Sequence, residues 1–410
     1  MKKIFILLLL SYSFSFAYFM IDDNYGKQLQ VLKNLDIDTS FFHDSKLLDI
    51  RNEMSQNQAK YFLRTLKNGS EFVPMLKKMI NDGGIPETFL YLAMVESEFS
   101  TKAYSKAKAS GLWQFMAPTA KKFGLEIDEY IDERRDPIKS TKAAIEYLQT
   151  LHKMFGKWYL AAMAYNCGEG RVSRAIKEAK TDNLAVLLDE DKKFLPAETR
   201  KYIRKIIAMA NLSEDINFIL ENEANYLLNR GTDTVLFEKV EVKGGSPLEA
   251  IASAINIPLE QLLNYNTHLN YFFTPPDKDK YHVYIPYDKR VDFANNFNEQ
   301  DVKLYVYIVK WGDNFSKISK QYNVSASVIK DFNGLDSYKL KVGQKIFIPG
   351  LTQNTEAKLA STKEYIIKKG DTLYSISSKY NVNIQTIMHA NNLKDGNIYP
   401  GGKLEIPTNF

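Results

Sequence analysis

Residues 86–100 read PETFLYLAMVESEFS, and this stretch has the pattern of an amphipathic helix. Four side chains recur at helical spacing and share one face of it: Phe89, Leu92, Glu96 and Phe99. A carboxylate therefore interrupts an otherwise apolar stripe. The segment predicts a core helix with one acidic group directed toward the protein interior.

Glu96 is the candidate catalytic residue. A carboxyl group that is partly withdrawn from water has a pKa above the usual value of ~4.3, because burial disfavours its charged form. A general acid that works near neutral pH needs such a shift. Glu98 lies about 200° around the same helix and is the weaker candidate. On this pattern alone, Glu96 could also belong to a structural ion pair.

Three further motifs follow: SGLWQFMAPTA at residues 110–120, LAAMAYNCGEGRV at 160–172 and LPAETRKYI at 195–203. Gly111 permits a close backbone approach in the first of them. Trp113 is expected to offer an aromatic face and Gln114 a bifunctional amide. A pyranose ring needs this combination, because its C–H face stacks while its edges form hydrogen bonds. The motifs therefore indicate a sugar site, with Phe115 and Met116 beside it.

The C-terminal part contains a duplication. Aligning Gly312 with Gly370 gives an offset of 58 residues, which holds without a gap to the end of the chain and pairs Ile348-Pro349 with Ile406-Pro407. Each copy has alternating β-formers, two short helical stretches and a second alternating run. The expected order of elements is β-α-α-β.

A third, degraded copy precedes these two. It keeps Ile255-Asn256-Ile257 and closes with Tyr284-Ile285-Pro286, but it lacks a Gly-Asp pair. We expect it to fold and leave open whether it binds a ligand. The expected division of the chain is 1–17, 18–65, 66–215, 235–290, 304–350 and 364–408.

Composition excludes several classes of protein. Of 410 residues, 45% are hydrophobic and 25% charged, which is typical of folded domains. A net charge of +5 does not favour a nucleic-acid partner. Five scattered histidines and one cysteine support neither a zinc site nor a disulfide framework. We expect no metal and no organic cofactor.

The first 17 residues, MKKIFILLLLSYSFSFA, resemble an export signal. Two lysines precede an apolar run, and Ser15-Phe16-Ala17 has the small-x-small pattern of a cleavage site. An uncleaved anchor is the alternative, although the run is short for a bilayer, which needs ~20 residues. We expect an exported protein in the periplasm of a Gram-negative-type envelope.

Taken together, the Glu96-Ser97 pair and the motifs GLWQFM, AYNCG and LPAETRKY resemble the goose-lysozyme-like soluble lytic transglycosylase domain, and the repeats resemble LysM modules. The resemblance covers nearly everything except roughly residues 18–65. It implies a multidomain protein, with a mainly α lysozyme-like catalytic domain followed by small α+β modules of βααβ order. Its implied partner is the glycan strand of peptidoglycan.

The resemblance also implies roles for individual residues. Glu96 becomes the catalytic acid and base, and Glu198 either contacts the peptide stem of the substrate or pairs with a nearby arginine. Six positions are implied to bind substrate: Ser105, Gln114, Met116, Tyr165, Asn166 and Tyr202. Six are implied to bind glycan in the modules: Gly312, Asp313, Gly370, Asp371, Thr372 and Asn391. The alternative for the module residues is that they build turns.

Two departures from the family pattern stand out. Family members usually carry a lipid anchor on a cysteine directly after the apolar run, but no cysteine stands at that place here. We therefore expect no lipoprotein, and peripheral membrane association stays open. Cys167 stands where the family has a small residue such as alanine, and we interpret it as a buried thiol. A Cys–His hydrolase that uses Cys167 and His152 lacks support.

The candidate site residues indicate a reaction that uses one carboxylate. Glycosidases normally use two carboxyl groups, but Asp132, Glu133 and Asp136 read as a polar turn before a helix. We expect Glu96 to protonate the bond between N-acetylmuramic acid and N-acetylglucosamine. It then takes the proton of the muramoyl C6 hydroxyl, and a 1,6-anhydro ring closes. The alternatives are a lysozyme-like muramidase, a non-catalytic peptidoglycan-binding protein and a chitin-directed binder.

Overall fold

The computed structural model describes residues 24–56, 59–222 and 236–299, and residues 303–407 apart from gaps at 323, 325, 351–361, 369, 381, 383–386, 389–390, 392 and 394–397. The predicted export signal lies outside these ranges. The chain forms two compact units. One comprises Met1–Ile127 and Asp132–Leu236, and the other comprises Asp128–Ile131 and Phe237–Phe410.

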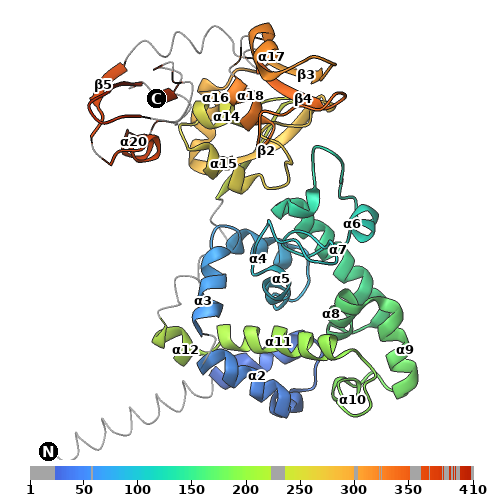
Figure 1. The fold of residues 1–410 in the computed structure, drawn as a ribbon. Coiled ribbons are helices and arrows are strands. Elements are labelled where there is room, and N and C mark those ends of the chain that lie inside the picture. Colours follow the sequence, from blue (N-terminus) through green and yellow to red (C-terminus); the bar gives the residue numbers. More distant parts are fainter. Residues whose placement is uncertain are drawn as a thin grey trace, which may run out of the picture. The chain divides into compact units, whose positions relative to one another are not determined.

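The first unit is helical (Figure 1). After a helix at residues 24–34, its elements, with η for 3-10 turns, are η1 (Thr39–His43), α2 (Ser45–Gln56), α3 (Ala59–Asn68), α4 (Val73–Asp82), α5 (Phe89–Ser97), α6 (Ala117–Lys122), η2 (Glu133–Arg135), α7 (Pro137–Phe155), α8 (Trp158–Cys167), α9 (Glu169–Ala179), α10 (Leu184–Leu187), α11 (Ala197–Ser213) and α12 (Ile216–Glu221). Among the helices that the structure describes, none is long and apolar enough to cross a membrane.

Helix α5 carries Glu96 in its last turn and is enclosed by the rest of the unit. Seven of its nine residues are buried, although the sequence predicted only one apolar face. The helix is also shorter than the predicted 86–100. It ends because Glu98 adopts a left-handed backbone with φ 54°, which an α-helix cannot continue. An enclosed helix gives the Glu96 carboxylate a fixed direction.

The N-terminal segment packs against the helices that carry the other motifs. Leu32 and Leu47 are fully buried, and α2 runs beside α11 (Figure 1). The Arg204 guanidinium on α11 donates to the Asp44 carboxylate at 2.9 Å. The backbone amide of Tyr159 on α8 donates to the Leu35 carbonyl at 3.1 Å. No packing partner for this segment could be named from the sequence, and the structure makes it part of the first unit's core.

The second unit contains three copies of the repeat. The first two show the predicted β-α-α-β order, and in the third the described residues show the first strand, the first helix and the last strand. Their elements are β1 (Phe237–Lys243), α14 (Leu248–Ala254), α15 (Leu259–Tyr265), β2 (Lys280–Pro286), η3 (Tyr287–Lys289) and α16 (Arg290–Asn296); β3 (Lys303–Ile308), α17 (Phe315–Tyr322), α18 (Ala326–Phe332) and β4 (Lys345–Gly350); and β5 (Thr362–Ile366), α20 (Leu373–Tyr380) and β6 (Lys403–Pro407).

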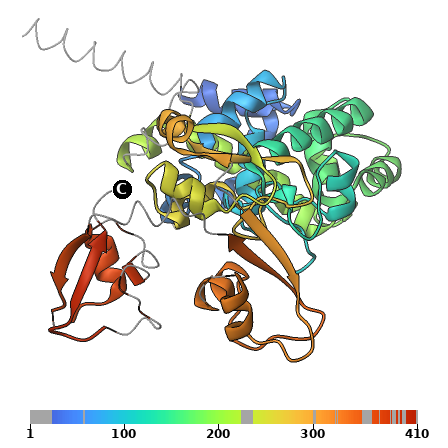
Figure 2. The same cartoon turned by 90° about the horizontal axis from the view of Figure 1, so that it is seen from above.

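In each copy the first and last strands pair antiparallel as a two-stranded sheet. Figure 2 shows the strand pairs of the last two copies, in orange and red, with helices alongside. Tyr307 pairs with Ile346, and Tyr365 pairs with Leu404. Both partners differ by 58 residues between the copies, so the sequence offset reproduces the strand register.

One asparagine per copy joins the second helical stretch to the last strand. The Asn333 amide nitrogen donates to the carbonyls of Ile329 and Phe347, each at 2.7 Å, and its oxygen accepts from the Phe347 amide. Asn266 and Asn391 make the same three bonds in the other copies. We call these three residues the junction asparagines. They satisfy backbone groups that the short elements leave unpaired.

Candidate active site

The carboxylate of Glu96 meets the hydroxyl of Tyr202, which comes from α11. The hydroxyl donates to Glu96 Oε1 at 2.6 Å. Burial raises the pKa of Glu96 to about 7, the Tyr202 hydrogen bond opposes that shift, and the charge of Glu198 adds to it. Glu96 therefore exchanges a proton near neutral pH, as its place in an apolar stripe predicted.

Tyr202 itself stays protonated. Burial, together with the neighbouring charge of Glu96, raises the pKa of Tyr202 well above 10. Its hydroxyl thus remains a donor at every pH at which Glu96 titrates. A donor at a fixed short distance orients the carboxylate and favours its charged form.

Tyr165, on α8, lies in the same buried region. Its hydroxyl donates to the Trp113 carbonyl at 2.7 Å, so it joins α8 to the 110–115 loop. The charge of Glu96 contributes to raising the pKa of Tyr165. Tyr147 on α7 packs 5.2 Å from the Tyr165 ring, centroid to centroid, and burial raises the pKa of Tyr147 to about 12. Sequence reasoning missed Tyr147, although it lies three residues after Ala144 and four before Leu151, both of which are buried, so its helical spacing was available as a signal.

Asn166 and Cys167, at the end of α8, face the start of α11. The Asn166 side-chain oxygen accepts from the Thr199 hydroxyl at 2.7 Å. This bond connects the AYNCG motif to the helix that carries Tyr202. The bond fixes the ends of two helices that line the site, and substrate binding by Asn166 stays a prediction.

The serine after the acid holds the next loop against α5. The Ser97 hydroxyl donates to the Leu112 carbonyl at 2.8 Å. Gly111, with φ 81°, lies so close to the backbone of Arg134 that a Cβ atom would be 1.8 Å from that carbonyl oxygen. The close approach predicted at Gly111 is thus confirmed, and only glycine fits there.

The residues expected to line the cleft differ in accessibility. Met116 is 44% exposed, and Gln114 is partly exposed while its amide nitrogen donates to the Gly111 carbonyl at 2.8 Å. Ser105 is partly exposed, and its hydroxyl accepts from the Ala109 amide at 3.0 Å. Tyr104, which the sequence reasoning did not single out, is 64% exposed beside Ser105.

The aromatic faces expected at Trp113 and Phe115 are unavailable to a sugar. Trp113 is fully buried and its indole nitrogen donates to the Thr141 hydroxyl at 2.8 Å, while Phe115 is 2% exposed. Both rings belong to the core, because the loop folds inward over α7. That expectation was wrong.

Glu98, the weaker candidate for the catalytic acid, forms contacts away from the Glu96 carboxylate. Glu98 lies 3.7 Å from the Arg64 guanidinium and interacts with the Tyr61 hydroxyl. Glu98 has a left-handed backbone at the end of α5, and its partners Arg64 and Tyr61 lie on α3.

The turn before α7 uses its acids structurally. Asp132 accepts two bonds from the Arg134 side chain, at 2.8 and 2.9 Å. Glu133 is fully buried and pairs with Lys139, and Asp136 caps the first turn of α7. The sequence indicated the turn but not its burial. Within residues 59–222, no carboxylate other than Glu198 perturbs the titration of Glu96.

Cys167 and His152 do not form a pair. His152 stacks on Trp158 at 3.7 Å between ring centroids, at the opposite end of α8 from Cys167. Nine helical steps separate the two ends by about 14 Å. Burial raises the pKa of the Cys167 thiol, which disfavours a nucleophilic thiolate.

The module residues implied to bind glycan make contacts within their own copies. Asp313 accepts from the Tyr307 hydroxyl and the Lys310 amide, and Asp371 does the same with Tyr365 and Lys368. Gly312 and Gly370 have φ of 80° and 91°, Thr372 interacts with Ser375 at the start of α20, and Asn391 is a junction asparagine. These are turn-building contacts, so glycan binding by these particular residues stays a prediction.

Family profiles match this architecture. The transglycosylase SLT domain matches residues 74–187. The LysM-like domain of lytic transglycosylase MltD matches 236–302, and the LysM domain matches 307–349 and 365–407. A helical SLT domain with a buried glutamate of raised pKa, followed by LysM modules, defines an enzyme of the lytic transglycosylase class.

Comparison with individual proteins gives the family of the chain. The chain is 31% identical over 340 residues to membrane-bound lytic murein transglycosylase D of Escherichia coli (strain K12), covering 78% of this chain and 73% of the relative. The chain therefore belongs to the family of membrane-bound lytic murein transglycosylase D. It is also 40% identical over 107 residues to N-acetylmuramoyl-L-alanine amidase sle1 of Staphylococcus epidermidis, covering 25% of this chain and 33% of that one. The solved structure of soluble lytic transglycosylase SLT70 from Escherichia coli is 26% identical with a TM-score of 0.29, covering 35% of this chain and 24% of that one.

Proposed function

We propose that this enzyme cleaves the β-1,4 bond between N-acetylmuramic acid and N-acetylglucosamine in peptidoglycan and leaves a 1,6-anhydro-muramoyl end. The observation that supports this proposal is the hydrogen-bonded pair of Glu96 and Tyr202. A carboxyl group with a pKa of about 7 and a fixed hydroxyl donor can give up a proton and take one back within one turnover.

The reaction proceeds in two proton transfers. Protonated Glu96 donates to the bridging oxygen as the bond from that oxygen to muramoyl C1 breaks, and the acetamido oxygen of the same sugar stabilises the developing positive charge at C1. Ionised Glu96 then removes the proton of the C6 hydroxyl, and the C6 oxygen bonds to C1. Glu96 ends protonated, no water is consumed, and the strand is split into two ends.

One carboxylate is sufficient for these two proton transfers, because the C6 hydroxyl of the substrate is the nucleophile. An inverting hydrolase requires a second carboxyl group about 6.5–9.5 Å away to activate water. In the described part of the first unit, Glu98, Asp132, Glu133 and Asp136 are engaged in contacts away from Glu96. Glu198 is exposed and makes no hydrogen bond to Glu96.

Residues around the pair position the sugar. We assign Ser105, Gln114 and Met116 to the substrate-facing surface, and Tyr165 and Asn166 to the support of the site. The LysM modules bind the glycan strand. We divide the chain as predicted from sequence, with the export signal at 1–17 directing the protein to the periplasm.

Product analysis tests the proposal. Purified murein is digested with the full-length protein, and the released muropeptides are separated and weighed. We expect muramoyl ends lighter by one water than reducing ends. The Glu96→Gln variant should lose activity by at least about 10²-fold, because it cannot transfer a proton. Reducing ends from the wild type, or full activity of Glu96→Gln, would contradict the mechanism.

A further inference from the structure

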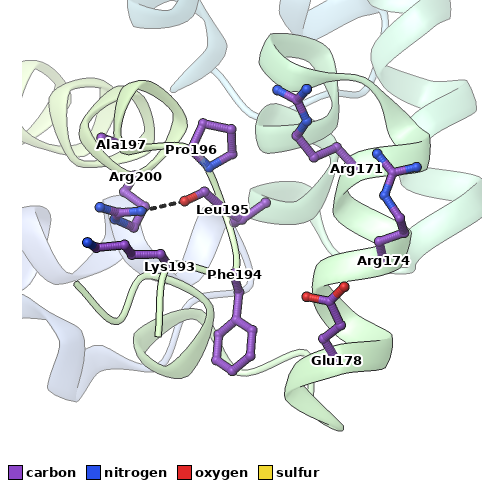
Figure 3. A pocket seen from close by; sticks show the side chains of 9 residues that line it. All are labelled: Arg171, Arg174, Glu178, Lys193, Phe194, Leu195, Pro196, Ala197 and Arg200. Carbon is purple, nitrogen blue, oxygen red and sulfur yellow. Dashed lines mark hydrogen bonds between the residues drawn. The ribbon is translucent and has the colours of Figure 1, made fainter. Parts of the chain in front are cut away.

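A hollow of about 570 Å³ opens beside the first turn of α11 (Figure 3). Arg171 and Arg174 project into it from α9, and residues 193–197 form the facing wall. None of the site residues discussed above lines it. Its volume lies in the range of sites that hold small molecules. We call it the basic hollow.

Cations outnumber carboxylates in the lining of the basic hollow. Arg171, Arg174 and Lys193 are exposed, and Glu178, also exposed, is the one carboxylate among the described lining residues. Among the described residues, Glu178 forms no ion pair with any of the three cations. Arg171 and Arg174 are three residues apart on one helix, so their guanidinium groups are neighbours and repel each other. A bound anion would relieve that repulsion. Guanidinium groups bind carboxylates through paired hydrogen bonds.

The facing wall is fixed before any ligand arrives. Arg200 is buried, donates to the Glu190 carboxylate at 2.7 Å and also bonds the Leu195 carbonyl (Figure 3). The Asp189 carboxylate accepts from the amides of Asp191 and Lys192, each at 2.8 Å. Lys193 follows directly on this loop. A preformed site loses less entropy on binding than a mobile one.

The basic hollow adjoins the catalytic pair. Ala197, at its edge, is five residues before Tyr202 on α11, which corresponds to about 8 Å along the helix axis. The charge of Arg171 acts on Cys167, the residue after Asn166. A group attached to the sugar next to Glu96 can therefore reach the hollow.

The substrate carries suitable anions at that place. The muramic acid lactyl group bears a short peptide whose acidic residue and C-terminus present carboxylates, and Phe194 and Pro196 offer apolar surface for its alkyl parts. We propose that the basic hollow binds the carboxylates of this peptide stem, so that the enzyme prefers peptide-bearing strands over bare glycan. The inference rests on the proposed function, because it places the muramic acid beside Glu96.

The test compares two substrates with two charge-matched variants of the full-length protein. The substrates are soluble murein strands and the same strands after an amidase has removed their stems. Arg171→Gln/Arg174→Gln changes the hollow. Lys177→Gln/Lys180→Gln removes two charges at the end of α9, from exposed residues that do not line it. The readout is the ratio of kcat/KM on peptide-bearing strands to kcat/KM on bare strands.

We expect this ratio to exceed one in the wild type and to fall about three- to tenfold in the arginine variant, the effect of losing two partly exposed ion pairs. The lysine variant should keep the wild-type ratio, and Arg171→Lys/Arg174→Lys should keep part of the preference. An unchanged ratio in the arginine variant, or an equal loss in the lysine variant, would overturn the inference. A wild type that cleaves neither substrate would instead refute the proposed function.

Discussion

Replacing Tyr202 by phenylalanine removes the hydroxyl that donates to Glu96 Oε1 at 2.6 Å and leaves the buried ring in place. The change separates two effects of that hydroxyl. It orients the carboxylate, which speeds the reaction, and it stabilises the ionised form, which lowers the pKa of Glu96. We therefore expect the variant to be slower and to keep Glu96 protonated to higher pH.

The size of the shift follows from the bond. A hydrogen bond to a charged group contributes about 1.5–3 kcal/mol, and one pKa unit corresponds to about 1.4 kcal/mol. The neutral acid keeps part of the bond, so the pKa of Glu96 should rise by about one unit, from about 7 to about 8. Activity requires protonated Glu96 at the start of turnover, so the alkaline limb of the profile moves upward.

The assay is the pH dependence of kcat/KM on soluble murein strands between pH 5 and 9. The ratio of variant to wild-type activity should rise about fivefold between pH 6 and pH 8, because the protonated fraction falls less in the variant. Tyr165→Phe is the matched control, since its hydroxyl donates to the Trp113 carbonyl and makes no hydrogen bond to Glu96. An alkaline limb that stays in place or moves down in Tyr202→Phe would refute this reasoning.

Three further predictions concern stability. The pKa of Glu96 is higher in the folded than in the unfolded state, so the free energy of unfolding of the wild type falls as pH rises from about 4.5 to 7. Urea unfolding should therefore show that Glu96→Gln is more stable than the wild type by up to about 3 kcal/mol at pH 8 and no more stable at pH 4. Gly111→Ala should lower the free energy of unfolding by about 3 kcal/mol or more, because its Cβ would meet the Arg134 carbonyl; a thermal midpoint equal to the wild type's would contradict this. Asn333→Ala should raise hydrogen exchange in the 304–350 module while leaving residues around Glu96 protected, because it breaks three bonds of its junction; equal exchange in wild type and variant would count against it.

The acid was predictable because its signal is local. Glu96 interrupts an apolar run, and the helical periodicity from Phe89 to Phe99 is enough to place it inside the protein. Tyr202 carries no such signal, because it comes from a helix 106 residues further along the chain. Only the resemblance of LPAETRKY to a known motif pointed to it. Pairing of distant helices depends on packing that one sequence does not display.

The C-terminal modules were predictable for a different reason. Two copies at a constant offset repeat the same pattern of strands and turns, so each supports the interpretation of the other. The offset correctly gave equivalent strand partners at Tyr307 and Tyr365. It could not distinguish turn-building residues from ligand contacts, because both are retained when a module is copied.

The failed expectations also have physical causes. Trp113 and Phe115 lie in a motif with sugar-binding character, but burial of a large aromatic surface stabilises the core and outweighs exposure to a ligand. The N-terminal segment has helical spacing in its sequence. That spacing indicates that one face of each helix is buried, but it does not identify the element against which the face packs. Its contacts with α8 and α11 bridge more than 120 residues of sequence.

The duplication in the C-terminal part has a kinetic consequence. The two LysM matches, at residues 307–349 and 365–407, follow each other closely in one chain. Once one module has bound a glycan strand, the second module encounters the cell wall at an effective concentration in the millimolar range. The affinity of each module can thus be low while the enzyme as a whole stays bound to the cell wall. Frequent release of single modules lets the catalytic unit reach one bond after another without leaving the surface.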